Sequence, residues 1–410
     1  MKLYNSKSRK IEIFKPVEDK KVKMYVCGIT PYDTTHLGHA FTYVCFDVLV
    51  RYLKFKGFQV TYTQNVTDID DDILKKAKEV GKNWKELGQY WTDRFTTDMK
   101  ALNVLPPTYY VKATESLPKM IEIIKSLIQQ NIAYENEGNV YFDVKKFKAY
   151  GELSKLNRNQ MLQIAKDRGG NPDDSKRRDP LDFLLWQKSS NGEPYWESPG
   201  GKGRPAGRRG SPGGRPGWHI ECSAMVYQYL GDQIDIHGGG RDLIFPHHES
   251  EIAQSESYTH KIPYVKYWIH TAMLMYNGEK MSKSLGNLIM VSDLLKKYSA
   301  SAIRWVLLSH HYRTPWEFNY KELDEAEQEI FQIKTTLNHL GPSSHSEPDL
   351  SGEKSNEYLK QFTNLMDNDL DTPAALSLMK ILGNNILKKG KANVEDSQKV
   401  LKNLLKILGF

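Results

Sequence analysis

Hydrophobic and polar residues in the N-terminal part of the chain follow a pattern that predicts a strand, a helix and a second strand. Residues 22–27 (VKMYVC) are typical of a buried strand, which we expect to end at Gly28. Apolar residues then recur at helical spacing over about 36–56. Residues 58–66 (FQVTYTQNV) alternate like a further strand. A βαβ unit of this length predicts a parallel sheet with a right-handed crossover.

The pattern changes along the rest of the chain. A second amphipathic helix is predicted over 114–132, and mixed, polar sequence follows it. Strand and helix signals alternate again over 219–290. From about residue 292 the pattern is helical, with a polar interruption at 341–356, and the last segment, 357–410, contains two amphipathic helical patterns. We therefore interpret the polar middle of the chain as material inserted between two halves of one nucleotide-binding sheet.

Composition sets broad limits. The 410 residues are 39% hydrophobic and 26% charged, as in a soluble globular protein. A net charge of +7 is compatible with RNA or a nucleotide as partner, but many metabolic enzymes have a similar charge. No segment is typical of a signal peptide or a membrane span, and three cysteines form no disulfide framework. We expect a cytoplasmic protein without membrane contact.

Residues 198–217 (SPGGKGRPAGRRGSPGGRPG) contain a near-repeat of SPGG with basic residues between and beside the copies. Our preferred interpretation is a flexible surface insertion that arose by local duplication. The alternative is a basic flap that contacts phosphates. The basic side chains concerned are Lys202, Arg204, Arg208, Arg209 and Arg215.

Two motifs could bind a nucleotide. In THLGHA, His36, Gly38 and His39 open the first predicted helix, whose free N–H groups suit a phosphate. In EKMSKSLGN, Lys280 and Lys283 are three residues apart in a short polar loop and could bracket a triphosphate. Each string alone could be an ordinary helix cap or a solvated loop. Together, and in this order, they resemble the two ATP signatures of class I aminoacyl-tRNA synthetases.

A third group of residues could bind a metal. Cys27 ends the first strand, Cys222 lies in GWHIECSAM, and His247 and Glu251 are four residues apart in FPHHESE. Sulfur, imidazole and carboxylate are credible zinc ligands. Spacing alone leaves the alternatives open, because single cysteines are usually core residues and neighbouring histidines often lie in surface turns.

Taken in order along the chain, the motifs resemble those of cysteinyl-tRNA synthetases. MYVCGITPYD, THLGHA, NVTDIDD, GRPGWHIECSAM, DIHGGGRDLIFPHHESEIAQSE and GEKMSKSLGN follow one another over nearly the whole chain. The resemblance implies one zinc ion on Cys27, Cys222, His247 and Glu251, and an amino-acid pocket formed with Thr67 and Trp218. It also implies that ATP with Mg²⁺ is bound by the residues His36, Gly38, His39, Gly238, Gly239, Gly240, Asp242, Lys280 and Lys283.

The resemblance further implies what the enzyme does. L-Cysteine would be activated with ATP to cysteinyl-adenylate, and His36, His39, Lys280 and Lys283 would carry catalysis before transfer to the 3′ end of tRNA(Cys). A mycothiol-pathway ligase, which transfers cysteine to the amine of glucosaminyl-inositol, is the alternative, suggested by CGITPYDTTHLGHAFTY and by the stretch at 167–172. A non-catalytic paralogue is a third possibility, disfavoured because every phosphate-handling residue is present.

The expected architecture is an α/β fold with a Rossmann-type parallel-sheet catalytic domain, an inserted connective domain and a C-terminal helical region. We expect a monomer whose C-terminal region is shorter than that of longer synthetases and stops before an anticodon-reading part. The predicted segments are 1–112, the first half of the catalytic domain; 113–195, the connective region; 196–290, the second half; 291–345, a helical stem-contact region; and 346–410, the C-terminal helices.

Overall fold

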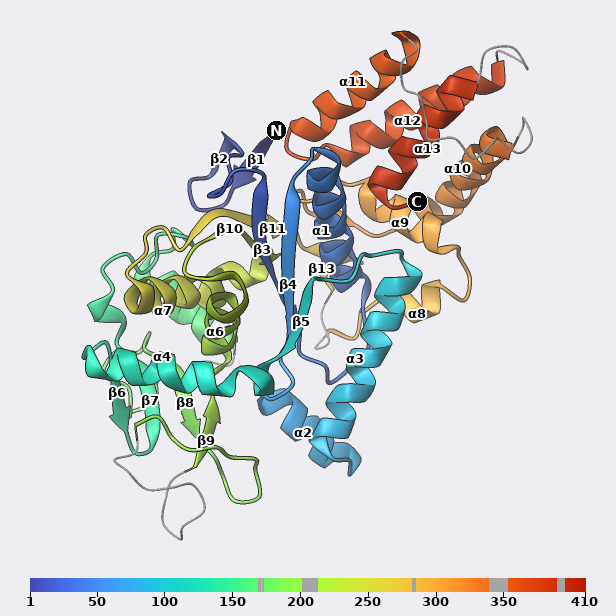
Figure 1. Ribbon diagram of the computed structural model, residues 1–410. Coiled ribbons are helices and arrows are strands. Elements are labelled where there is room, and N and C mark those ends of the chain that lie inside the picture. Colours follow the sequence, from blue (N-terminus) through green and yellow to red (C-terminus); the bar gives the residue numbers. More distant parts are fainter. Residues whose placement is uncertain (169–170, 172, 201–212, 282–284, 339–352, 389–394) are drawn as a thin grey trace.

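The computed structural model describes residues 1–410 apart from 169–170, 172, 201–212, 282–284, 339–352 and 389–394. At its centre is a parallel five-stranded sheet with the order β11-β10-β3-β4-β5 (Figure 1). The strands are β3 (Lys21–Ile29), β4 (Gln59–Val66), β5 (Tyr109–Lys112), β10 (Ile234–Gly240) and β11 (Val265–Thr271). The predicted α/β class with a Rossmann-type parallel sheet is confirmed.

Helices cover both faces of this sheet. Helix α1 packs on one face, and α6 packs on the other with α4 and α7 against it (Figure 1). The elements are α1 (Leu37–Phe55), α4 (Leu117–Gln129), α6 (Trp218–Leu230) and α7 (Glu249–Thr259). Two further helices, α2 (Asp71–Val80) and α3 (Trp84–Ala101), connect β4 to β5. The predicted βαβ unit is thus present as β3, α1 and β4.

Between β5 and α6 the chain builds a second, antiparallel sheet with the order β6-β7-β8-β9. Its strands are β6 (Ala133–Asn136), β7 (Asn139–Phe142), β8 (Phe183–Lys188) and β9 (Gly214–Pro216), and helix α5 (Arg158–Asp167) lies between β7 and β8 in the chain. Short 3₁₀ turns at Ala113–Ser116, Val144–Lys146 and Arg241–Leu243, and a turn at Ile244–His248, complete this half of the molecule.

The C-terminal part is mostly helical. Its helices are α8 (Val291–Leu294), α9 (Ala300–Leu308), α10 (Tyr320–Asn338), α11 (Glu353–Asp367), α12 (Thr372–Lys388) and α13 (Glu395–Leu408). A small sheet of β12 (Leu274–Tyr276), β13 (Glu279–Lys280) and β14 (Trp316–Glu317) joins it to the central sheet. The segment 357–410 therefore contains parts of three helices, not two, because the turn between α11 and α12 is short and lacks glycine.

Strand β3 distributes its side chains between two hydrophobic cores. Met24 and Val26 lie in the core that contains α1, whereas Tyr25 and Cys27 lie in the core that contains α6. This division follows from the alternation of side chains along a strand. Cys27 therefore lies on the side of the sheet where α6 presents Cys222.

The expectation that β3 ends at Gly28 was wrong. The strand continues to Ile29, with an irregular register between Val26 and Ile29. A Cβ at Gly28 would lie 1.6 Å from the carbonyl oxygen of Asn65, and the Gly28 N–H donates to Asn65 Oδ1 over 2.7 Å. Glycine is required here by the close approach of β4, and not by a chain reversal.

An N-terminal hairpin, which the sequence pattern did not predict, joins distant parts of the chain. Its strands are β1 (Lys2–Asn5) and β2 (Lys10–Ile13). The Tyr4 N–H donates to Asp369 Oδ1 over 2.7 Å, and the Ser6 N–H donates to the carbonyl of Trp268 over 2.8 Å. Strands of four residues with several charges give too little alternation to be recognised.

A buried ion pair joins α1 to the C-terminal helices. Arg304 pairs with Asp47, and its guanidinium also donates to the carbonyls of Leu408 (2.7 Å) and Leu102 (2.9 Å). Both side chains of the pair are almost completely buried.

Among the described residues, no helix combines the length and apolar character needed to cross a membrane.

We expect an Arg304→Met variant to lose about 2–4 kcal/mol of unfolding free energy, because two buried carbonyl groups lose a donor and the buried Asp47 carboxylate keeps only Arg51 as a cationic partner. Urea unfolding followed by tryptophan fluorescence would measure the change. Arg158→Met is the matched control, since Arg158 is half exposed in its pair with Asp179 and should cost about 1 kcal/mol or less. Equal losses in the two variants would contradict this account.

Candidate active site and metal centre

The candidate site lies at the carboxyl ends of β3 and β10, where the chain order in the sheet reverses direction. In open α/β sheets such a switch point is the usual place for a ligand. A cavity of about 520 Å³ opens there. Among its lining residues are eight that the sequence predicted for ATP, metal or cysteine: Cys27, His36, Gly38, His39, Trp218, Gly240, Asp242 and Lys280.

The two histidines of THLGHA are fixed at the start of α1. His36 is the N-cap of the helix, and its Nδ1 accepts a hydrogen bond from the His39 N–H over 3.3 Å. The two imidazole rings are stacked with centroids 3.6 Å apart. The N–H groups of Leu37, His39 and Ala40 already donate to the carbonyls of Ile289 and His36. The first turn of α1 therefore contributes its two imidazoles to the cavity, and these can donate hydrogen bonds to a phosphate group.

Two of the glycines predicted for the nucleotide site lie elsewhere. Gly238 and Gly239 are not part of the cavity lining. A Cβ at Gly238 would lie 2.1 Å from the Phe46 ring, so this glycine lets α1 pack closely on β10. Lys280 is placed on β13 at the cavity. Lys283 lies outside the described residues.

The four predicted metal ligands lie together below this cavity. One donor atom each from Cys27, Cys222, His247 and Glu251 lies within 4.8 Å of the other three, and all four side chains are buried. The two Sγ atoms are 3.8 Å apart, and His247 Nε2 is 3.1 Å from Glu251 Oε1. Strand β3, helix α6, the turn Ile244–His248 and the start of α7 supply them, so residues distant in sequence form one group.

The electrostatics of this group favour a bound cation. Burial raises the pKa of the Cys27 and Cys222 thiols and of the Glu251 carboxyl, and it lowers the pKa of His247. A neutral imidazole is the form that binds a metal. A cation within reach of all four would offset the cost of ionising the buried thiols and carboxyl. The group can therefore hold a metal ion.

Histidines that sequence reasoning missed surround this group. His219 Nδ1 lies 2.9 Å from His247 Nδ1, which leaves His247 Nε2 directed at Glu251. His248 Nε2 is 3.2 Å from Cys27 Sγ, and His237 Nε2 is 2.8 Å from Glu251 Oε2. Cys27, His237, His248 and Glu251 consequently form a second possible ligand set. The pair HH and the buried strand IDIHGGG were the only sequence signals for these side chains.

The two residues predicted for the amino-acid pocket are held in different ways. The Trp218 ring lines the cavity and stacks on the His247 ring at 4.2 Å. Thr67 is buried and is not among the lining residues. Its hydroxyl donates to Glu221 Oε2 over 2.8 Å and accepts from Asn65 Nδ2 over 3.2 Å.

Thr67 belongs to a chain of hydrogen bonds between the two cysteines. The residue after Cys27 donates its N–H to the Asn65 side chain, Asn65 donates to Thr67, and Thr67 donates to Glu221, the residue before Cys222. Because these groups are buried, each bond restrains its neighbours. This chain of hydrogen bonds links β3, β4 and α6 beside the thiols of Cys27 and Cys222.

The basic residues between and beside the SPGG copies fall into two groups. Lys202, Arg204, Arg208 and Arg209 lie outside the described residues. Arg215 lies in β9, where it is buried and forms ion pairs with Asp71 and, at 3.7 Å, with Glu193. Arg215 is thus a structural cation and is not available to a phosphate group.

Asp70 makes the folded state sensitive to pH. Its carboxylate caps α2 by accepting from the Ile73 N–H, and it lines a cavity that also contains Trp218. Burial raises the pKa of Asp70 to about 7. Because this folded-state pKa lies above the unfolded value of about 3.9, protonation of Asp70 stabilises the folded state. The contribution is fully present below about pH 3.9 and is lost as the pH rises through about 7.

Asp70→Asn keeps a capping side chain but does not titrate. We therefore expect the free energy of unfolding of the variant, relative to that of the unmodified protein, to increase by about 2–3 kcal/mol between pH 5 and pH 8. Urea unfolding at the two pH values measures this difference. Asp396→Asn, an exposed position in the first turn of α13, is the control and should change little with pH. Identical pH dependence of the Asp70 variant and the unmodified protein would contradict the prediction.

Comparison with solved structures identifies the same fold in class I synthetases. The chain superposes on a methionyl-tRNA synthetase of Mycobacterium tuberculosis in complex with methionyl-adenylate, with a TM-score of 0.62, 14% identity, and 95% and 89% of the two chains covered. It also superposes on the LeuRS–tRNA–LeuAMS complex of Agrobacterium radiobacter K84, with a TM-score of 0.64, 13% identity, and 96% and 84% covered.

Comparison of sequences is more specific. Residues 13–328 match the family of the class I (C) tRNA synthetase catalytic domain. The chain is 45% identical to a cysteine–tRNA ligase of Dehalococcoides mccartyi strain 195, over 100% of this chain and 86% of that protein. It is 43% identical to a cysteine–tRNA ligase of Methanococcus maripaludis, over 95% and 80%. The chain belongs to the class I tRNA synthetases of type C, the family of the cysteinyl-tRNA synthetases.

Proposed function

We propose that the protein activates L-cysteine with ATP and transfers the cysteinyl group to the 3′ end of tRNA(Cys). One observation carries this proposal: His36, His39, Lys280 and Cys27 line one cavity, and Cys27 also belongs to a buried group of two thiols, an imidazole and a carboxylate. Trp218 connects the two parts, since it lines the cavity and stacks on His247. The relatives named cysteine–tRNA ligase support the same activity.

The proposed metal is zinc, held by Cys27, Cys222, His247 and Glu251. A tetrahedron with Zn–S bonds of about 2.3 Å has its sulfurs about 3.8 Å apart, and the two Sγ atoms are 3.8 Å apart. When bound, zinc would favour the thiolate of the substrate over a serine hydroxyl, which is a much poorer ligand. An apolar pocket would distinguish such similar side chains by only about 1–3 kcal/mol.

The residues around the cavity would then carry the phosphate chemistry. The cysteine carboxylate attacks the α-phosphorus of ATP, a new O–P bond forms, and the bond to pyrophosphate breaks. His36 and His39 line the cavity, where they would stabilise charge on the phosphoryl oxygens, and Lys280 would stabilise the leaving pyrophosphate together with Mg²⁺. A hydroxyl of the terminal adenosine subsequently attacks the adenylate carbonyl and releases AMP. Catalysis thus depends on positioning and charge, without a covalent enzyme intermediate.

Cysteine-dependent exchange of pyrophosphate into ATP tests activation, and we expect exchange with cysteine and none with serine. Transfer is tested by offering deacylated tRNA(Cys) and glucosaminyl-inositol in parallel. We expect acylation of the tRNA alone. Transfer only to the sugar amine would favour a mycothiol-pathway ligase, and absence of exchange at saturating cysteine and zinc would reject both enzymes.

A further inference from the structure

The two thiols of the metal group are close enough to react with each other. Cys27 Sγ and Cys222 Sγ are 3.8 Å apart, whereas the sulfurs of a disulfide are about 2.05 Å apart. Each sulfur therefore has to move by only about 0.9 Å for a bond to form. The third cysteine, Cys45, lies in the core around α1, on the opposite face of the central sheet. Cys27 and Cys222 are thus the pair of thiols that the fold brings together.

Hydrogen bonds hold this pair together independently of a metal. The residue after Cys27 donates its N–H to Asn65 Oδ1 over 2.7 Å, and Asn65 Nδ2 donates to Thr67 over 3.2 Å. The Thr67 hydroxyl donates over 2.8 Å to the side chain of the residue before Cys222. All three side chains of this connection are buried. We therefore expect the two sulfurs to stay within reach of each other when a metal leaves.

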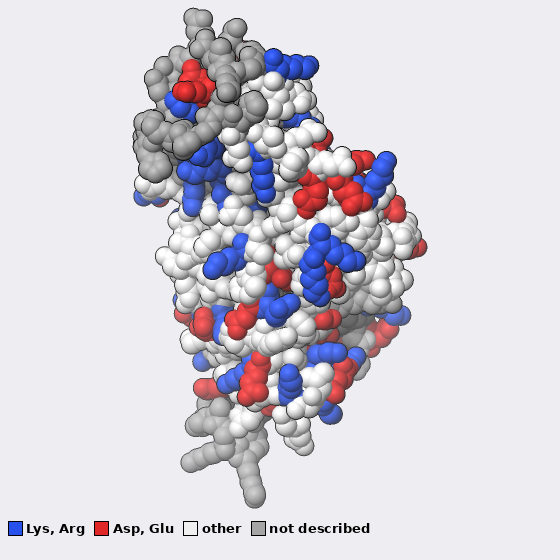
Figure 2. Space-filling model, turned by 90° about the vertical axis from the view of Figure 1, so that its right-hand side faces the viewer, with Lys and Arg blue, Asp and Glu red and all other residues white. Residues whose placement is uncertain are grey.

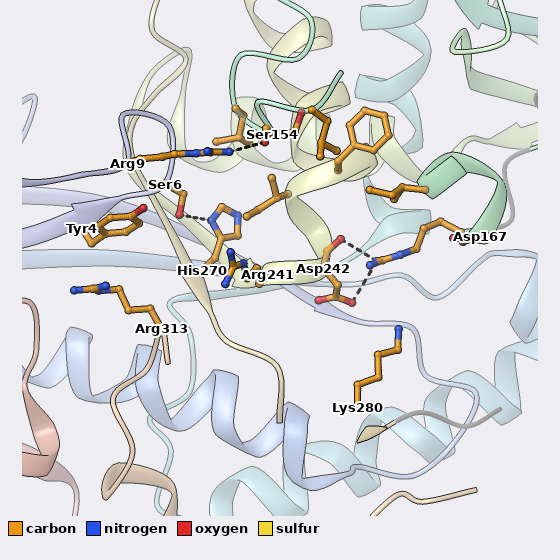
Figure 3. A pocket seen from close by; sticks show the side chains of 16 residues that line it. Tyr4, Ser6, Arg9, Ser154, Asp167, Arg241, Asp242, His270, Lys280 and Arg313 are labelled. Carbon is orange, nitrogen blue, oxygen red and sulfur yellow. Dashed lines mark hydrogen bonds and ion pairs between the residues drawn. The ribbon is translucent and has the colours of Figure 1, made fainter. Parts of the chain in front are cut away.

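The two thiols differ in their access to a small solute. Cys27 lines the cavity of about 520 Å³, whereas Cys222 is 1% exposed and is not part of that lining. A neighbouring cavity of about 920 Å³ is shown in Figure 3, and none of the described residues that line it is a cysteine. A solute that enters from either side therefore meets the sulfur of Cys27 first.

Hydrogen peroxide suits this route because it is small and uncharged. The lining of the cavity at Cys27 contains the carboxylates of Asp33, Asp72 and Asp242 and the cations Arg168 and Lys280. Charges of both signs are also interspersed on the face of the molecule in Figure 2. Such a surface neither concentrates nor repels an uncharged oxidant. Size, and not charge, therefore governs its entry.

We propose that Cys27 and Cys222 are a site of reversible oxidation by hydrogen peroxide. The Cys27 sulfur attacks one peroxide oxygen, an S–O bond forms and the O–O bond breaks, and the departing hydroxide takes a proton to become water. The Cys222 sulfur then attacks the Cys27 sulfur, the S–S bond forms and the S–O bond breaks, and the second oxygen leaves as water. Two thiols are oxidised to one disulfide, and one peroxide is reduced to two waters.

The disulfide would release the proposed zinc ion, because zinc binds thiolates and a disulfide sulfur carries no such charge. His247 and Glu251 alone then remain, fewer than the three or four protein ligands of ordinary zinc sites. This consequence rests on the proposed function, whereas formation of the disulfide does not. A dithiol such as dithiothreitol breaks the S–S bond by exchange and becomes a disulfide itself, after which zinc can bind again.

Peroxide treatment of the zinc-loaded full chain tests the proposal. We expect a chain that is lighter by two hydrogen atoms, a cross-linked Cys27–Cys222 peptide in the digest, and one zinc ion released for each disulfide. Dithiothreitol followed by zinc should restore cysteine-dependent pyrophosphate exchange to within about twofold of its starting value. Cys45→Ser is the matched control and should give the same peptide and the same release of zinc.

Two further variants test the order of attack. Cys222→Ser and Cys27→Ser each lack one metal ligand, so they are compared with each other, after circular dichroism has shown that both are folded. Dimedone traps a sulfenic acid. We expect it to label Cys27 in the first variant at least about tenfold faster than Cys222 in the second, because only Cys27 lines the cavity.

Release of zinc without the cross-linked peptide, or a disulfide that contains Cys45, would overturn the proposal. Equal rates of labelling in the two single variants would overturn the assignment of Cys27 as the thiol that is attacked first. Absence of pyrophosphate exchange before peroxide is added would instead reject the proposed function. The cross-linked peptide would still be detected in that case, so the two failures are distinguishable.

Discussion

A Cys222→Ser variant is expected to lose at least about 1,000-fold in cysteine-dependent pyrophosphate exchange, which corresponds to about 4 kcal/mol of transition-state stabilisation. Cys222 Sγ lies 3.8 Å from Cys27 Sγ, in the group that also contains His247 and Glu251. An alcohol is a far weaker zinc ligand than a thiolate, so the variant should also lose its zinc. Zinc content by mass spectrometry and exchange kinetics would be measured on the same preparations.

The same variant distinguishes the two possible ligand sets. Cys27 and Glu251 belong to both sets, whereas Cys222 belongs only to the set with His247. His237→Gln is the matched control, because His237 belongs only to the other set and should retain full zinc content. If His237→Gln lost the metal and Cys222→Ser kept it, the assignment of ligands would be reversed. Equal loss in both variants would mean that the buried group holds zinc only as a whole.

A Lys280→Met variant is expected to exchange pyrophosphate about 100- to 1,000-fold more slowly at saturating cysteine and ATP. Lys280 lies on β13 at the cavity that contains His36 and His39. Removing one preorganised donor from a developing negative charge typically costs this much. The effect should fall on kcat, with the KM for cysteine within about threefold, because the amino acid binds on the side of Trp218 and the metal group.

Lys297→Met is the control for this prediction, since Lys297 is an exposed lysine outside the lining of the cavity that contains His36 and His39. Steady-state exchange kinetics with varied ATP and varied cysteine separate the two effects. A higher KM for ATP with unchanged kcat would show that Lys280 contributes equally to the ground state and the transition state. That result would contradict a catalytic role.

Local pattern was sufficient to predict the βαβ unit, because the segments of β3, α1 and β4 each have a clear pattern of apolar residues. It also predicted α4, although Ala113–Ser116 forms a separate 3₁₀ turn and α4 begins at Leu117. Cys45 falls on the apolar face of the helix predicted over 36–56, and it lies in the hydrophobic core around α1. In these cases the burial of each side chain follows from its own helix or strand.

The histidines around the metal group could not be predicted in this way. His219, His237, His248 and His270 come from four elements, and the local pattern of each segment gives no sign that the four side chains are buried together. Their roles depend on pairwise contacts, such as the 2.8 Å between His248 Nδ1 and His270 Nε2, which local periodicity does not encode. Likewise, the sequence pattern treated Gly28 as a strand end, because only the neighbouring strand shows that Asn65 leaves no room for a side chain.

The N-terminal hairpin has a consequence for the time at which the molecule can be completed during synthesis. Residues 2–6 leave the ribosome first, yet their partners Trp268 and Asp369 are made more than two hundred and sixty residues later. Until then the hairpin cannot bring Arg9 against Ser154. Contacts of such long sequence separation form late in folding. The hairpin therefore gains its last partner, Asp369, only after the whole central sheet has been translated.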